Sequence, residues 1–363
     1  MSLILTKEKI HKILKKKKLI IPKETILKHL YSTKNIFLKF AKSNEIINNY
    51  KVGEKRELDE INPLLWQYGH VVFFYISLVL KNLPNCSDFP EFHHLIEFYD
   101  SHKTPANNRY CNQMLDYNRC INLYIRVIDT LQIYMYQIKI GKIESYLIML
   151  GILHNEMHNE ALIFTLLNFN VKIDLPLINL TKKRMLEYFK DELITDITFI
   201  KYNDSNFIQG SKERKNILTF DNEMPSFKTT IKNFEMSKYP VTEYLYSQFI
   251  RSGGYENPEY WCRNGYKWIK DNSINLPKYW FLKGNKYFKN INGQIYETGT
   301  NLPMSNISYY EAQAYCKWRR VRLPLESEYE FAATNSGKTL YPWGNEEPNS
   351  TLCNINYTNN IVR

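Results

Sequence analysis

The first half of the chain has apolar residues at helical spacing, from about residue 23 to residue 170. Such a pattern predicts helices with one buried face, and four of them together would form a bundle. The predicted helices lie at about 24–50 with a break, 62–82, 91–100, 111–139 and 142–169.

The second half has a different pattern, in which short β-prone runs alternate with Gly, Pro and Asn turns. Ser308 and Glu311 have the spacing of a capping box, which marks the start of a helix. This half therefore predicts a loop-rich α+β domain, with the boundary somewhere in 170–220. The predicted elements are strands at 227–234 and 286–291, a helix at about 308–320 and a short helix that begins near Leu325.

Composition narrows the class of protein. A chain of 363 residues is long enough for two cores. The net charge of +11 owes much to runs such as Lys15–Lys18, which is typical of a solvated helix face or tail rather than of a nucleic-acid surface. The six cysteines show no CxxC spacing, which favours reduced thiols in a cytoplasmic protein. The longest apolar run, Val71–Leu80, is too short to span a membrane, and we expect no membrane partner.

Three histidines are the strongest candidates for chemistry. His154 and His158 are four residues apart, so a helix would place both on one face. His70 ends the run Trp66–His70 at the start of a very apolar helix. Three imidazoles from two helices could hold one metal ion and leave positions open for substrate or oxygen. The alternative is that they are hydrogen-bonded core histidines.

The neighbours of these histidines refine the prediction. A zinc protease motif would require Glu directly after the first histidine of the pair, where this chain has Asn155. Glu156 is expected to be a surface carboxylate. Glu160 either orients a ligand through a hydrogen bond or faces solvent. Gly69 would let another backbone or a ligand approach closely.

Two sets of motifs resemble one family. Pro63–His70 and His154–Leu162 resemble the DinB-like helical domain of the ergothioneine-type sulfoxide synthases. The second half resembles the formylglycine-generating-enzyme fold, a C-type-lectin-like α+β domain that is fused to the helical domain in those synthases. The resemblance implies a DinB-like four-helix bundle followed by an incomplete C-type-lectin-like domain. The segments that carry the second resemblance are 220–225, 240–242, 249–255, 303–308, 311–318, 322–333 and 341–344.

This resemblance implies an activity and a site. Members of the family use Fe(2+) and O2 to join a cysteine-type thiol to the imidazole of histidine or its trimethylated betaine, and selenium-using relatives run similar chemistry. The implied iron ligands are His70, His154 and His158. Arg109 is the first candidate to bind the carboxylate of the thiol substrate, because a guanidinium matches a carboxylate with two hydrogen bonds, and Arg119 is a weaker candidate.

The chain also departs from the family pattern. The later blocks of the family, which supply core strands and much of the imidazole pocket, have no counterpart after Gly344. We therefore expect either a separate chain that completes the domain or a remnant with impaired activity. The alternatives to the synthase are a non-catalytic binding module and a DinB-like thiol transferase that uses zinc or nickel. The expected organisation is a basic segment at 1–22, the bundle at 23–170, a connecting segment at 171–215 and the second domain at 216–363.

Overall fold

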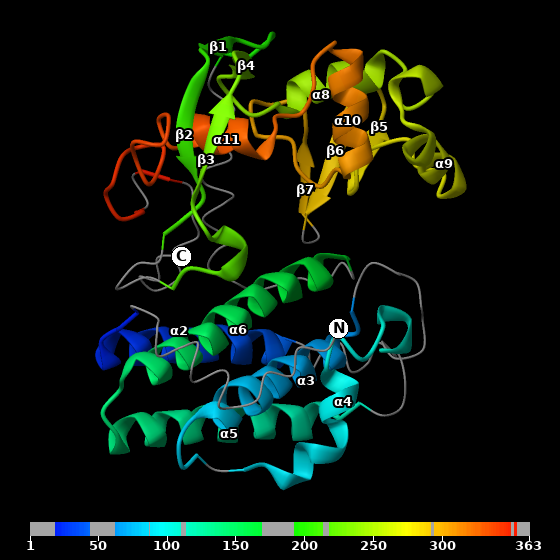
Figure 1. Cartoon of the computed structure of the whole chain (residues 1–363). Helices are drawn as coiled ribbons and strands as arrows, with labels where there is room; N and C mark the ends of the chain where they lie inside the picture. The colour runs from blue at the N-terminus through cyan, green and yellow to red at the C-terminus, as the bar shows by residue number, and fades with distance from the viewer. Residues whose placement is uncertain are drawn as a thin grey trace. The chain divides into compact units, whose positions relative to one another are not determined.

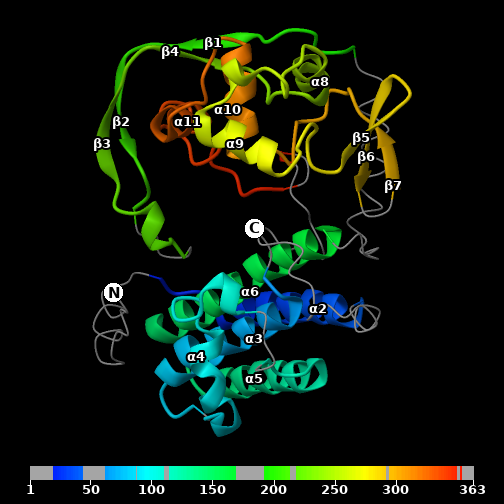
Figure 2. The same ribbon diagram turned by 90° about the vertical axis from the view of Figure 1, so that its right-hand side faces the viewer.

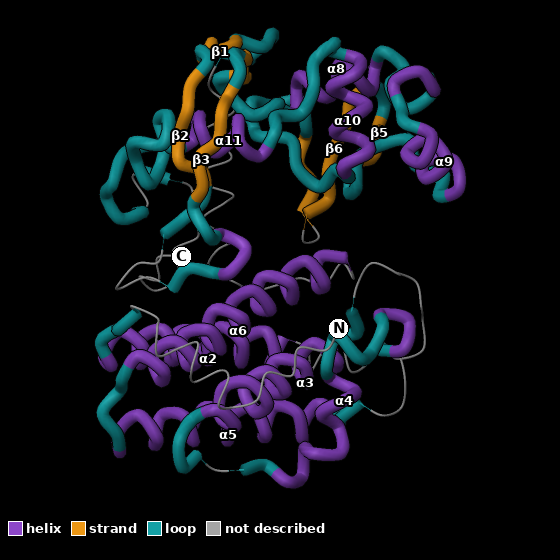
Figure 3. Tube along the Cα trace, in the orientation of Figure 1, coloured by secondary structure: helices purple, strands orange, loops and turns teal. Residues whose placement is uncertain are grey.

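The computed structural model forms two compact units, the first helical and the second containing the strands of the described chain (Figure 3). The run Lys15–Lys18 and most of the expected connecting segment lie outside the described residues, so the three boundaries between the four expected segments stay predictions. The described residues are 19–43, 62–86, 88–109, 114–168, 192–212, 218–291, 294–349 and 352–353.

Four long helices run side by side in the first unit (Figures 1 and 2). Helix α2 packs against α5 and α6, and α3 packs against the same two helices. Each helix therefore has two neighbours, as in a bundle. The predicted helical N-terminal region is confirmed, while its DinB-like family assignment stays a prediction. The helices are α2 (Lys23–Ser43), α3 (Leu64–Phe74), α5 (Tyr117–Gln137) and α6 (Lys142–Asn168).

Helix α3 continues as a π-helical turn, η2 (Tyr75–Val79), and a 3-10 turn, η3 (Leu80–Asn82). The continuous segment Leu64–Asn82 has 19 residues and passes a membrane-span test by length and composition. However, 72% of its apolar window is buried inside the protein, which fits the core helix of a bundle. The chain then forms three short elements, η4 (Pro90–Leu95), α4 (Ile96–Tyr99) and η5 (Ala106–Asn108).

Aromatic side chains fill the bundle core and hold the helices in place. The Phe37 ring of α2 stacks on the Tyr124 ring of α5, with 4.0 Å between their centroids. Phe37 also makes a T-shaped contact with Tyr68 of α3, with 5.0 Å between the ring centroids. All three side chains are almost fully buried. Aromatic pairs contribute about 0.5–1.5 kcal/mol each beyond the area they bury. This packing sets the position of α3 within the bundle.

The second unit begins with a long antiparallel hairpin in two parts. Its outer part pairs β1 (Phe199–Tyr202) with β4 (Phe234–Ser237), and its inner part pairs β2 (Ser205–Gln209) with β3 (Phe227–Ile231). The predicted strand at 227–234 is therefore wrong as a single element. The two parts are separated by residues 203–204 on one side and 232–233 on the other, where the Asn233 amide donates to the Asp204 carboxylate at 2.5 Å.

The rest of this unit combines a three-stranded antiparallel sheet with short helices. The predicted strand at 286–291 is confirmed. The predicted capping box is also confirmed. Ser308 Oγ accepts from the Glu311 amide at 3.2 Å, and the Glu311 carboxylate accepts from the Ser308 amide at 2.7 Å. The elements are α8 (Glu243–Arg251), η7 (Pro258–Tyr260), α9 (Arg263–Asp271), β5 (Trp280–Lys283), β6 (Lys286–Ile291), β7 (Gln294–Glu297), α10 (Tyr309–Trp318) and α11 (Glu326–Ala333), while the short turn η6 (Asp221–Glu223) is grouped with the first unit.

Candidate metal centre

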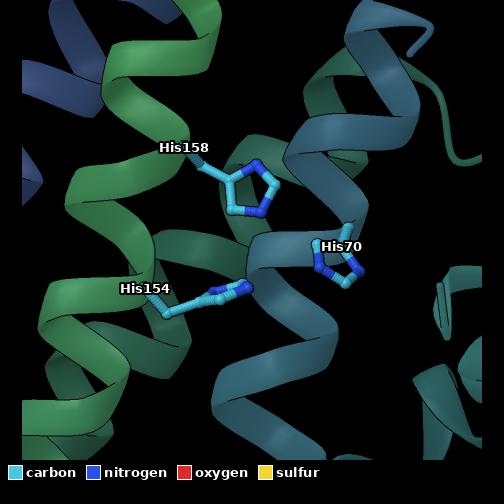
Figure 4. Close-up of side chains that lie close together, drawn as sticks. All are labelled: His70, His154 and His158. Atoms are coloured by element: carbon cyan, nitrogen blue, oxygen red, sulfur yellow. The ribbon is translucent and has the colours of Figure 1, made fainter. Parts of the chain in front are cut away.

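The structure brings the three predicted histidines together inside the helical unit. His154 and His158 project from successive turns of α6, and His70 points toward them from α3 (Figure 4). The possible ligand nitrogens, one from each ring, all lie within 4.8 Å of one another. Two nitrogens bound to one ion at about 2.1 Å lie at most about 4.2 Å apart. Small side-chain rotations are thus enough for a single ion to bind all three.

Burial makes this cluster a good match for a metal ion. Burial, together with a smaller effect of the neighbouring imidazoles, lowers the pKa of His154 to about 2 and of His158 to about 3. Both rings are therefore neutral and carry a free lone pair at neutral pH. The Nδ1 atoms of His154 and His158 are buried without a hydrogen-bond partner. Buried polar atoms normally have partners, and a bound cation would be a suitable partner for a lone pair of each neutral ring.

His70 is oriented by a main-chain carbonyl. Its Nδ1 lies 2.7 Å from the carbonyl oxygen of Tyr99, an acceptor that requires the proton to be on Nδ1. Nε2 is then the nitrogen available to a metal, which is the usual arrangement of a metal-binding histidine. Burial is also the main reason why the pKa of His70 is lowered.

Gly69 lets the ring of Tyr99 lie close against α3. A Cβ atom on residue 69 would lie 2.0 Å from the Tyr99 ring, closer than real Cβ contacts allow. The close approach expected at Gly69 is confirmed, but the approaching group is the side-chain ring of Tyr99 and not a backbone segment or a ligand. Tyr99 therefore acts on two successive residues of α3. Its ring leaves no room for a side chain at residue 69, and its carbonyl orients His70.

Aromatic rings cover two of the three imidazoles. The indole of Trp66 is nearly parallel to the His70 ring, at 4.8 Å and 11°. Phe74 stacks on His154 at 3.7 Å and 10°. These rings keep water from two sides of the cluster and lower the local dielectric constant, which favours neutral imidazoles.

Residues beside and opposite the histidines of α6 take part in a buried polar network. The Oδ1 atom of Asn155 accepts from Tyr124 at 2.7 Å and from Tyr75 at 3.5 Å. Thr33 donates to Glu156 at 3.0 Å, and Glu156 is only 6% exposed. The expectation that Glu156 is a surface carboxylate is therefore wrong, because α2 covers that side of the helix. The network fixes the rotation of α6, and thereby the direction in which its two histidines point.

The other predicted site residues have different surroundings. Arg109 donates to Thr104, Asn62 and Ser101, as described below. Arg119 is 79% exposed in its side chain and pairs with Asp116, the cap of α5. Glu160 is exposed on α6. The roles of Arg109 and Arg119 in substrate binding and of Glu160 in orienting a ligand stay predictions. The Tyr99 carbonyl was missed, since main-chain acceptors leave no trace in side-chain patterns.

The second unit matches a known domain family. Residues 199–360 match the sulfatase-modifying factor enzyme 1-like domain. The chain is thus a helical N-terminal region followed by a small, β-rich domain of the formylglycine-generating-enzyme type. The C-type-lectin-like description of that domain stays a prediction, as does its incompleteness.

The chain is also similar to curated proteins over part of its length. Hercynine oxygenase of Mycobacterium tuberculosis is 30% identical over 154 residues, which are 41% of this chain and 36% of the relative. Hercynine oxygenase of Mycolicibacterium smegmatis is 30% identical over 141 residues, or 38% and 32% of the two chains. The mouse protein named inactive C-alpha-formylglycine-generating enzyme 2 is 31% identical over 149 residues, or 36% and 47%. The matches span about a third to a half of these relatives.

The buried histidines predict how stability depends on pH. In the unfolded chain their pKa is about 6.5, whereas in the folded, metal-free protein it is about 2 for His154 and about 3 for His158. Below pH 6.5 the unfolded state binds protons that the folded state does not, so stability falls as the pH drops from about 6.5 toward 3. Each histidine contributes up to about 1.4 kcal/mol per pH unit.

Urea unfolding of the metal-free protein at several pH values, followed by helical circular dichroism, measures this slope. The matched control is the double variant His154→Ala/His158→Ala, which should lose much of the slope. An equal slope in both proteins would contradict the assignment of buried, neutral imidazoles.

Proposed function

We propose that this protein is a non-haem iron(II) enzyme that uses O2 to join a cysteine-type thiol to a histidine-derived imidazole, with a sulfoxide as product. The observation that carries the proposal is the convergence of three neutral imidazoles within 4.8 Å. The similarity to two hercynine oxygenases supports the same chemistry, at about 30% identity over part of each chain. A cytoplasmic location is part of the proposal.

The residues of the cluster would divide the work. His70, His154 and His158 would hold the ion, and the Tyr99 carbonyl keeps the His70 proton on Nδ1. Iron(II) bound by three neutral imidazoles would supply open adjacent positions and redox chemistry for a thiolate and O2. Trp66 and Phe74 shield the site from water.

A second candidate function is a non-catalytic module. One relative, 31% identical over 149 residues, carries the word inactive in its name.

A three-histidine site also suits zinc, which would fit a metal-dependent thiol transferase. No comparison supports a separate chain that completes the second domain.

Anaerobic reconstitution with iron(II), followed by O2 uptake with γ-glutamylcysteine or cysteine plus hercynine, tests the proposal. We expect about one iron per chain and O2 consumption only when thiol and imidazole are both present, with the sulfoxide detected by mass spectrometry. Iron binding without any O2 uptake would favour the non-catalytic module. Retention of zinc in preference to iron, again without O2 uptake, would favour the transferase.

A further inference from the structure

Arg109 lies at one end of a three-layer stack that ends on a histidine of the cluster. Its guanidinium carbon is 4.1 Å from the centroid of the Trp66 ring. Trp66 in turn faces His70 at 4.8 Å and 11°. Trp66 and His70 are one helical turn apart on α3, and both are buried. The order of the layers is therefore guanidinium, indole and imidazole.

One short segment, residues 98–104, supplies main-chain acceptors to all three layers. Because these carbonyls belong to one stretch of backbone, they hold the three planes in register with one another. The bonds run from Trp66 Nε1 to Phe98 at 3.1 Å, from His70 Nδ1 to Tyr99 at 2.7 Å, and from Arg109 to Ser101 at 3.2 Å and to Thr104 at 3.0 Å.

The guanidinium also ties this segment to the start of α3. Its Nη1 atom donates to the Asn62 side chain at 2.6 Å. Asn62 stands two residues before α3, and its main-chain carbonyl accepts from Gln67 at 3.0 Å. Three different nitrogens of Arg109 therefore bind three protein oxygens while its guanidinium carbon lies over the indole. A lysine ammonium cannot reproduce this combination, since it has neither the planar fork nor a flat face.

We propose that Arg109 is a positioning residue for the metal centre, which presses Trp66 against His70 and so fixes the orientation of that ligand. The inference rests on the proposed function insofar as the cluster binds iron. It assigns Arg109 a role different from binding the carboxylate of a substrate.

Iron(II) affinity of the full chain, measured anaerobically with the metal alone, tests the stack. We expect Arg109→Ala to weaken binding about 10–100-fold, as is typical when a group that orients a ligand is lost. Arg109→Lys should be weakened similarly, because charge alone does not restore the fork. The matched control is Arg126→Ala, since Arg126 also lies over a ring, that of Phe89 at 5.6 Å, and should bind iron as the wild type does.

A double-variant cycle asks whether Arg109 acts through the indole. Trp66→Leu keeps bulk without a stacking face, and Trp66→Leu/Arg109→Ala should bind iron as weakly as Trp66→Leu alone. Fully additive losses would overturn the inference. So would wild-type iron affinity in Arg109→Ala, which together with a raised KM for the thiol would make Arg109 a substrate clamp.

The tautomer of His70 separates this inference from the proposed function. In the metal-free protein, ¹⁵N signals of the ring should show the proton on Nδ1 in the wild type and in Arg126→Ala, but a mixture of tautomers in Arg109→Ala. An unchanged tautomer in Arg109→Ala would overturn the inference even if the wild type binds iron. A wild type that binds no iron would end the proposed function, and the tautomer result would still decide the role of Arg109.

Discussion

Replacing His154 with alanine is expected to abolish tight iron(II) binding. The variant leaves two imidazoles, and loss of a direct ligand should weaken affinity by on the order of 1,000-fold, more than the 10–100-fold typical of the groups that orient ligands. The stabilisation that metal gives to the fold should disappear as well. For the wild type this stabilisation is about 2.7 kcal/mol when free metal is 100 times the Kd.

Anaerobic titration and melting curves with and without iron(II) measure both effects. The matched control is His93→Ala, because His93 lies in the same unit but is 51% exposed and paired with Asp88. Helical circular dichroism checks that the metal-free variant is folded. Equal iron affinity in His154→Ala and the wild type would rule out the three-histidine centre.

Breaking the buried ion pair of the second unit is expected to cost about 3–5 kcal/mol of stability. Glu243 of α8 is 1% exposed and Lys289 of β6 is 9% exposed, and the two are directly paired. The Thr300 hydroxyl also donates to Glu243 at 2.9 Å. Glu243→Gln would leave the ammonium buried without its counter-charge, while its size hardly changes.

Urea unfolding followed by tryptophan fluorescence reports on this unit, because five of the six tryptophans lie beyond residue 260. Lys286→Ala is the matched control. It breaks the exposed pair of Lys286 with Glu297 in the same sheet and should cost less than about 1 kcal/mol. A loss no larger in Glu243→Gln than in this control would contradict a structural role for the buried pair.

The helices of the first unit follow closely from local sequence. The range predicted for the last helix was 142–169, and the structure has α6 at Lys142–Asn168. The helix predicted at 111–139 begins only at Tyr117, where the Asp116 side chain accepts from the Arg119 amide. In the second unit, α8 and α9 were not predicted as helices. At nine residues each they present few turns of a periodic pattern.

The sequence by itself determined that His154 and His158 share one face, because the helical repeat depends on hydrogen bonds between near neighbours. Only the tertiary structure decided that His70 meets them, because the approach of α3 to α6 depends on how the aromatic core packs. It also decided that the Tyr99 carbonyl, 29 residues from His70, sets the proton of that ring. Such a contact joins a side chain to backbone far along the chain, and no periodic pattern of residue types encodes it.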